Sequence, residues 1–387
     1  MLRTRWSVIA AFVLVTSANQ MLWLTFAPLT TDAAKHYGVG EGSIGALSAV
    51  FPLLYVVLAL PAGIALDRRF HASVRAGAVL TAVGALVRLA GDDFGWVLAG
   101  QLLVAVAQPL VTNSVAKVGA AYSSDADRPT AIAVCSAGLF AGMLLAFATG
   151  AAIGTAHLQL LLAVQAGYAV VGAALLAVGL RHPGRDVDEV PVESGKAALR
   201  LVWADPVMRS MTALVVVGFG VFVGLTTWLQ ALLEPDGVSE SEAGVLLLVM
   251  VVAGVGGSLV LPPLAARRGT ERSVLLASLV VTAVGAALLS VVHEVVLVGA
   301  ILAAMGLLLL ATLPIVLEVM ERRTGSASGT GAAVLWMAGN AGGLVVTGVL
   351  AALLDWPAAA FLVLAAVSLL GLPVLARMTA SSLRPAP

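Results

Sequence analysis

Long apolar stretches separated by short polar segments dominate the chain. Each stretch approaches or exceeds the roughly 20 residues that a helix needs to cross a bilayer, and they are too long and too uniformly apolar for the strands of an outer-membrane barrel. The pattern predicts an all-α membrane protein with twelve transmembrane helices, at 7–29, 43–66, 73–91, 95–117, 129–154, 158–180, 207–233, 241–264, 272–292, 295–319, 326–353 and 357–376.

The longest polar segment, 181–206, divides these stretches into two sets of six. Its Pro, Gly and mixed charges are typical of a surface loop, with a short helix expected at 194–204. We therefore expect an N-terminal six-helix half at 1–180, a cytoplasmic linker at 181–206 and a C-terminal six-helix half at 207–387.

Composition excludes several classes of protein. Of the 387 residues, 60% are hydrophobic and 11% are charged, whereas a soluble domain carries roughly 25% charged residues. Soluble enzymes, secreted disulfide scaffolds and nucleic-acid-binding proteins are therefore excluded. The single Cys135 cannot form an internal disulfide, and no residues have zinc-ligand spacing. We expect no metal site and no cofactor.

The basic residues predict the orientation. If both termini lie on one side of the membrane, all of the 21 Lys and Arg residues except Lys35 and Arg88 fall on that side. Cytoplasmic loops carry an excess of Lys and Arg, so we expect cytoplasmic termini in a multi-pass protein of the plasma, or inner, membrane. The acidic loop 234–242, which lacks basic residues, falls on the other side.

An internal repeat relates the two halves. Residues 44–74 align without gaps with 243–273, and the pair Arg68 and Arg69 then lies over Arg267 and Arg268. Many secondary transporters consist of two such repeats, with the substrate site between them near the bilayer midplane.

The segment Gly63–Arg69, between the second and third stretches, resembles the Gly-x-x-x-Asp-Arg loop signature of the major facilitator superfamily. The resemblance implies the major facilitator fold, close helix approach at the glycine, and a charged cluster that closes a gate. The second copy departs from it, with Pro262 and Ala266 in place of Gly and Asp. Alternatively, the segment is a basic turn that only sets topology. The expected gating residues are Gly63, Asp67, Arg68 and Arg75.

A finer resemblance covers mainly the first 150 residues. The segments Asn19–Trp23, Tyr37–Val39, Pro61–Asp67 and Ala105–Gln108 are similar to the feline leukaemia virus subgroup C receptor family. That family comprises facilitators linked to choline, ethanolamine and heme, so the resemblance implies one of these substrates.

Ionisable residues are absent from the middle of every apolar stretch. Intramembrane carboxylates and histidines are the usual proton relays, so proton coupling has no evident carrier. We expect Arg88, Lys117 and Glu318, near the ends of stretches, to extend towards the interface. Without a buried base for an anion, a neutral or cationic substrate remains.

Aromatic and amide residues do reach mid-membrane. Asn19 and Trp23 share one helix face, Trp336 and Asn340 repeat that spacing, and Phe222 is the repeat equivalent of Trp23. Aromatic faces attract cations, and amide oxygens are acceptors without charge. Alternatively, such amides only bridge helices and tryptophans anchor at interfaces. The expected substrate-binding residues are Trp23, Gln108, Phe222, Trp336, Asn340, Asn19 and Gln20.

The sequence thus predicts a monomeric transporter, not an enzyme, that moves a choline- or ethanolamine-like organic cation by facilitated diffusion and alternating access. Its partners are the small-molecule substrate and the lipid bilayer. Three alternatives remain open: a proton-coupled exporter of hydrophobic drugs, a heme transporter, and a transporter-shaped membrane receptor or sensor.

Overall fold

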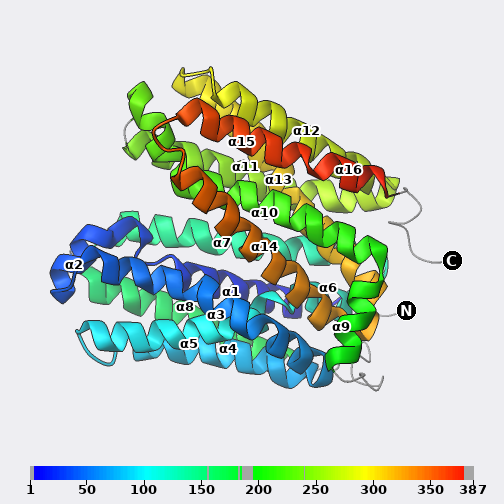
Figure 1. Cartoon of the computed structure of the whole chain (residues 1–387). Helices are drawn as coiled ribbons and strands as arrows, with labels where there is room; N and C mark the ends of the chain where they lie inside the picture. The colour runs from blue at the N-terminus through cyan, green and yellow to red at the C-terminus, as the bar shows by residue number, and fades with distance from the viewer. Residues whose placement is uncertain (1–3, 155–156, 182–183, 185–194, 239, 379–387) are drawn as a thin grey trace. The chain divides into compact units, whose positions relative to one another are not determined.

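The computed structural model describes residues 4–154, 157–181, 184, 195–238 and 240–378. Within these ranges every regular element is helical (Figure 1), and twelve helices are long and apolar enough to cross a membrane. The predicted all-α membrane fold with twelve spans is confirmed. The chain divides into two compact units, which we call the first unit (Met1–Leu199 and Thr324–Ala333) and the second unit (Arg200–Arg323 and Val334–Pro387).

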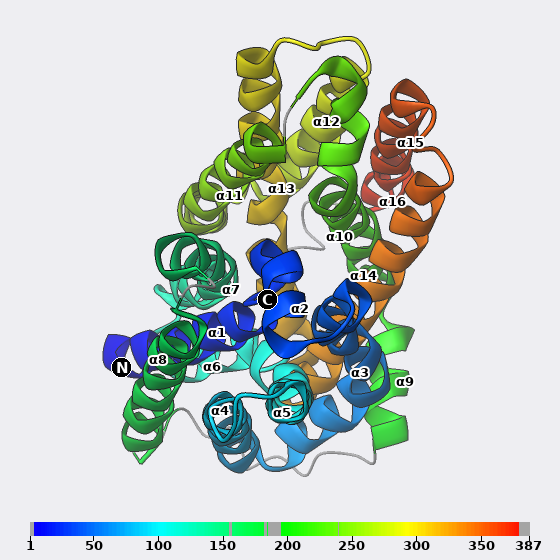
Figure 2. The same ribbon diagram turned by 90° about the vertical axis from the view of Figure 1, so that its left-hand side faces the viewer.

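The first unit is built around α1. This helix packs against α7, α8 and α5, while α4 packs against α5 and α8 (Figure 2). Ala18 and Leu22 of α1 lie in an apolar core with Phe51 and Val104. The helices are α1 (Trp6–Trp23), α2 (Thr30–Tyr37), α3 (Glu41–Arg68), α4 (Phe70–Val87), α5 (Phe94–Thr112), α6 (Val115–Ala121), α7 (Arg128–Ile153) and α8 (Leu158–Gly179). The helix α9 (Gly195–Ala204) follows and passes from the first unit to the second at Arg200.

The second unit contains most of the remaining spans. Within it α10 packs against α15, α16 and α11, and α12 packs against α15. The helices are α10 (Pro206–Leu233), α11 (Glu240–Arg268), α12 (Glu271–Leu289), α13 (Val295–Thr324), α14 (Ser328–Ala351), α15 (Pro357–Leu369) and α16 (Gly371–Ala376). The first turns of α14, up to Ala333, belong to the first unit, and the helix continues into the second unit from Val334.

Three predicted stretches are interrupted, the twelfth at Leu370 between α15 and α16. The first ends as a helix at Trp23, and the polar residues after it form the separate helix α2, which the apolar pattern did not indicate. The fourth breaks between α5 and α6 at Asn113, four residues after Pro109. The Asn113 amide donates to the Ala59 carbonyl at 3.0 Å and accepts from the Tyr55 hydroxyl at 2.6 Å. These bonds to α3 stabilise the break, since an asparagine side chain competes with regular helix bonding.

The connection between the second and third predicted stretches, 67–72, is also shorter than predicted. The helix α3 extends to Arg68 and α4 begins at Phe70, so Arg69 alone separates them.

Candidate functional site

Asp67, near the end of α3, lies at the centre of a buried polar group. Its side chain is fully buried. One carboxylate oxygen accepts from the backbone N–H of Gly329 at 2.7 Å and from the Lys117 ammonium at 3.2 Å. The other accepts from the backbone N–H of Thr330 at 2.8 Å and from its hydroxyl at 2.6 Å. The carboxylate therefore caps the N-terminus of α14, where the free backbone N–H groups favour a negative charge.

Gly63 permits the approach of α14 to α3. A Cβ atom at Gly63 would lie 2.5 Å from the carbonyl oxygen of Gly329 and 2.8 Å from the Cβ of Ala333. A Cβ at Gly329 would in turn lie 2.6 Å from the carbonyl oxygen of Gly63. Both glycines are thus required for the helix contact that carries the α14 N-terminus to Asp67.

The other two expected gating residues lie outside this group. Arg68 is exposed and forms no hydrogen bond or ion pair with any described residue. Arg75 donates to the carbonyl of Leu180 at 2.8 Å, just beyond the end of α8. Asp67 pairs instead with Lys117, which the motif did not indicate.

The expectation that Arg88, Lys117 and Glu318 reach the interface is wrong. Arg88 is 0% exposed, and Lys117 and Glu318 are each 3% exposed. The Arg88 guanidinium donates to Gln165 at 3.1 Å and to the Thr25 hydroxyl at 3.3 Å, and it lies 5.5 Å from the centre of the Phe26 ring. A basic residue near the end of an apolar stretch can therefore be drawn inwards by neutral acceptors.

The substrate residues expected in the first unit fall into two groups. Trp23 is partly buried, stacks on Phe51 with ring centres 5.8 Å apart, and donates its indole N–H to the Ser48 carbonyl at 3.0 Å. Asn19, although on the same helix, is 0% exposed and donates to Thr81 at 3.2 Å and to the Val104 carbonyl at 3.3 Å. Asn19 therefore bridges α1 to α4 and α5.

Gln20 and Gln108 behave differently from Asn19. Each is 5% exposed, and neither side-chain amide forms a hydrogen bond with a described residue. Nor are their amide atoms among the fully enclosed polar atoms that lack a partner, so these atoms keep some accessible surface. Most buried polar groups in proteins are hydrogen-bonded; these two amides remain open to a ligand.

The second unit brings its three expected residues together with a fourth. Trp336, 8% exposed, makes an edge-to-face contact with Phe219, with ring centres 5.7 Å apart, and Phe219 lies 6.2 Å from Phe222. Asn340 donates to the backbone carbonyl of Trp336 at 2.8 Å, so its amide oxygen points away from that bond. Sequence reasoning missed Phe219, although its position three residues before Phe222 places both on one face of α10.

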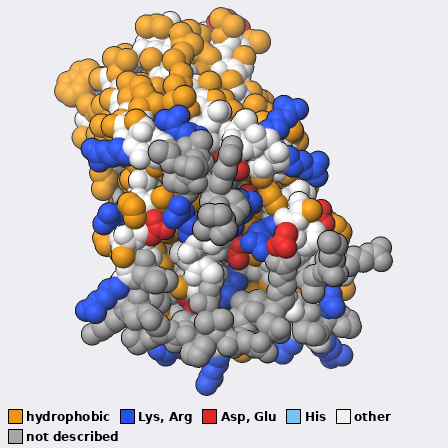
Figure 3. Space-filling model, turned by 90° about the vertical axis from the view of Figure 1, so that its right-hand side faces the viewer, with side chains coloured by type: hydrophobic (Ala, Val, Ile, Leu, Met, Phe, Trp, Pro, Cys, Tyr) orange, Lys and Arg blue, Asp and Glu red, His pale blue; other side chains and the backbone are white. Residues whose placement is uncertain are grey.

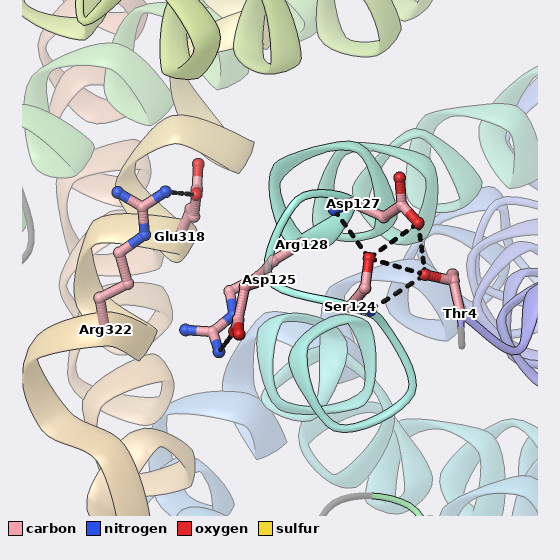
Figure 4. Close-up of polar contacts among 7 residues, drawn as sticks. All are labelled: Thr4, Ser124, Asp125, Asp127, Arg128, Glu318 and Arg322. Carbon is pink, nitrogen blue, oxygen red and sulfur yellow. Dashed lines mark hydrogen bonds and ion pairs between the residues drawn. The ribbon is translucent and has the colours of Figure 1, made fainter. Parts of the chain in front are cut away.

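Charged side chains gather on the face drawn in Figure 3, and hydrophobic side chains cover the surface beyond it. Figure 4 shows polar contacts among such residues. The hydroxyls of Thr4 and Ser124 both donate to the Asp127 carboxylate, at 2.5 and 3.0 Å. The figure also draws two ion pairs, Asp125 with Arg128 in the first unit and, within α13 of the second unit, Glu318 with Arg322. The separation of charged and apolar surface is typical of spans in lipid with turns in water.

Sequence comparison identifies related proteins. The family model for the Major Facilitator Superfamily matches residues 10–347. Solute carrier family 49 member A3 of Danio rerio is 29% identical over 282 residues, covering 67% of this chain and 58% of the relative. The choline/ethanolamine transporter flvcr2b of Danio rerio is 24% identical over 296 residues, with the same coverage of 67% and 58%. The chain therefore matches little more than half the length of either relative.

Comparison with solved structures supports the fold. The crystal structure of the human organic anion transporter MFSD10 (TETRAN) superposes with a TM-score of 0.78 at 16% identity, covering 95% of this chain and 99% of that one. At this identity the likeness concerns the fold alone. Both predicted resemblances, to the superfamily and to the feline leukaemia virus subgroup C receptor family, are confirmed by these relatives.

Proposed function

This chain belongs to the Major Facilitator Superfamily, and from that premise we propose that it carries a choline- or ethanolamine-like organic cation across the membrane as a uniporter, by alternating access. Its fold and family are those of transporters of small solutes. They fit a multi-pass integral membrane protein. The identity of the substrate and the absence of ion coupling are the parts that require support.

The observation that carries the proposal is the electrically neutral aromatic group of the second unit. Phe219, Phe222 and Trp336 lie in contact on α10 and α14. The helix α14 contains no ionisable residue, and α10 contains none after Arg209. A desolvated ammonium gains about 2 kcal/mol over an aromatic face. An anion would find no positive charge on either helix in this region.

The first unit carries residues of the same kinds. Trp23 and Phe51 form a stacked aromatic pair, and the amides of Gln20 and Gln108 form no hydrogen bond with a described residue. Their oxygens would accept from a hydroxyl or ammonium group of the substrate without adding a charge. The relative named as a choline/ethanolamine transporter supports the same substrate class.

We assign the gate to the Asp67 group. A carboxylate that holds the first turn of α14 stabilises one arrangement of that helix, and its release would permit another. Gly63 allows the contact, whereas Arg68 and Arg75 act elsewhere in this scheme. From the distribution of basic residues we place both termini on the cytoplasmic side of the plasma membrane.

Flux into liposomes containing the purified protein tests the proposal. We expect saturable uptake of choline or ethanolamine down its gradient, with a rate that an imposed pH gradient does not change. Accumulation driven by the pH gradient would contradict uniport. Absence of saturable flux of both amines would contradict the substrate class.

Trp336 tests the assigned site. Trp336→Ala should weaken choline binding about thirtyfold, the equivalent of about 2 kcal/mol, and Trp336→Phe should weaken it less. Trp356→Ala is the matched control, because Trp356 is 63% exposed and precedes α15. Binding isotherms normalised to folded protein should show weaker choline binding for Trp336→Ala and unchanged binding for Trp356→Ala. If Trp336→Ala lowers only thermal stability, the ring packs helices and does not contact substrate.

A further inference from the structure

A groove of about 530 Å³ lies on the first unit beside the turn between α3 and α4. Its volume is within the range of about 300–1,000 Å³ that is usual for ligand sites. Residues of α3 form one wall, residues of α4 form the other, and one residue of α5 contributes. The apolar part is lined by Pro61, Ile64, Ala65, Ala72, Ala76 and Leu110.

Small side chains leave this groove open. Ala65 on α3 faces the same space as Ala72 and Ala76, which are one turn apart on α4. Pro61, Ala72 and Ala76 are all exposed. These helices are membrane spans, so hydrocarbon is the medium that meets an exposed apolar surface at this level.

The end of the groove nearest the turn is strongly basic. Arg68 and Arg69, consecutive in the chain, both line it and are both exposed. Neither guanidinium forms a hydrogen bond or ion pair with a described residue. The adjacent carboxylate of Asp67 does not offset them, because it is buried and bonds to Lys117 and the start of α14.

The groove thus joins an apolar channel to two uncompensated positive charges. Arginine binds phosphate oxygens in a bidentate manner, and basic pockets between membrane helices bind anionic lipid head groups. A free phosphate would use only the arginines, whereas an uncharged apolar molecule would use only the channel. A molecule that carries a phosphate group and an acyl chain would contact both the arginines and the apolar channel.

We propose that the α3–α4 groove, with Arg68 and Arg69 at its mouth, binds one anionic phospholipid, the phosphate on the arginines and an acyl chain along the alanine-lined channel. The site is separate from the proposed substrate residues. Its test therefore does not depend on which solute the protein transports.

Native mass spectrometry of the purified full chain, titrated with phosphatidylglycerol or phosphatidylcholine, tests this site. We expect the first phosphatidylglycerol to bind more tightly than phosphatidylcholine. Arg68→Gln and Arg69→Gln should each weaken phosphatidylglycerol binding about fivefold, and the double variant about 25-fold. Phosphatidylcholine binding should change little.

The repeat-related turn provides the matched control. Arg267 and Arg268 are also consecutive and exposed, so Arg267→Gln/Arg268→Gln removes the same charge elsewhere. If this variant weakens phosphatidylglycerol binding as much as the Arg68/Arg69 double variant, the attraction is general and the site is wrong. Competition by inorganic phosphate at the concentrations at which the lipid binds would also overturn the proposal, because it would show that the acyl chain contributes nothing.

A variant that keeps both arginines tests the apolar part. Ala72→Leu, on the exposed side of α4, should fill the channel without loss of charge and weaken phosphatidylglycerol binding at an unchanged melting temperature. Unchanged lipid binding in this variant would overturn the proposed acyl-chain position. It also keeps the test available if the double arginine variant does not fold.

Discussion

Replacing Asp67 by Asn should destabilise the protein because it removes a negative charge from a closed polar group. Lys117, 3% exposed, would keep its ammonium without the carboxylate 3.2 Å away. An asparagine offers one oxygen where the carboxylate offers two, so the backbone N–H groups of Gly329 and Thr330 would compete for it. Its amide N–H₂ would be a further donor at a position where the surrounding groups now donate to the carboxylate.

The magnitude follows from these losses. Removing one partner of a buried ion pair costs about 3–5 kcal/mol, and one unpaired backbone N–H accounts for about 1–3 kcal/mol of this. We therefore expect Asp67→Asn to lower the free energy of unfolding by about 3–5 kcal/mol. Lys117→Met in the same chain should restore part of the loss, because no unpaired ammonium then remains buried.

Equilibrium unfolding in detergent micelles with increasing dodecyl sulfate measures both changes. A double-mutant cycle on Asp67 and Lys117 should give a coupling of about 1–3 kcal/mol. Asp355→Asn, at an exposed acid, is the control and should change the unfolding free energy little. A loss below about 1 kcal/mol for Asp67→Asn, or strictly additive effects in the cycle, would refute the reasoning.

Three further predictions concern other parts of the chain. Arg88→Gln should lower the free energy of unfolding by about 1–3 kcal/mol, since buried acceptors lose their donor; an unchanged unfolding curve would contradict this. The hydrogen bond with His36 lowers the pKa of Asp92, so its stabilisation is present above the ordinary aspartate value of about 4 and is lost as the pH falls through the lowered value. Melting curves from pH 6 to pH 3 should converge for the wild type and Asp92→Asn at the acid end, and a constant separation would argue against the contact. Because the native cysteine is buried, an impermeant maleimide should label Asp236→Cys but not Gly184→Cys in intact cells, and the reverse labelling would overturn the orientation.

The spans were predictable because membrane insertion imposes a simple requirement on composition. Every apolar stretch is largely helical, since a backbone in lipid must satisfy its own hydrogen bonds. Hydropathy does not predict where a helix is interrupted within an apolar stretch. The break at Asn113 depends on Tyr55 and the Ala59 carbonyl of α3, and these contacts exist only once the helices have packed.

The types of residue in the candidate site could be predicted from the sequence, but their hydrogen-bond partners could not. Aromatic and amide residues could be found from sequence, whereas the difference between Asn19 and Gln108 is one of packing. Asn19 meets Thr81 and the Val104 carbonyl, while the Gln108 amide meets no described partner. Two of the four bonds to the Asp67 carboxylate come from backbone N–H groups of distant residues, and the residue type does not reveal which backbone groups a side chain will meet.

The capping of α14 by Asp67 has a consequence for biogenesis. A ribosome makes Asp67 long before it makes Gly329 and Thr330, yet these two residues provide three of the four hydrogen bonds to the carboxylate. Of the described partners of this carboxylate, Lys117 is the one that the ribosome has made before α14 is synthesised. Residues Thr324–Ala333 belong to the first unit, so that unit remains incomplete until the eleventh span emerges. A chain truncated before this span should therefore retain an unfinished N-terminal half, which is a substrate for membrane quality control.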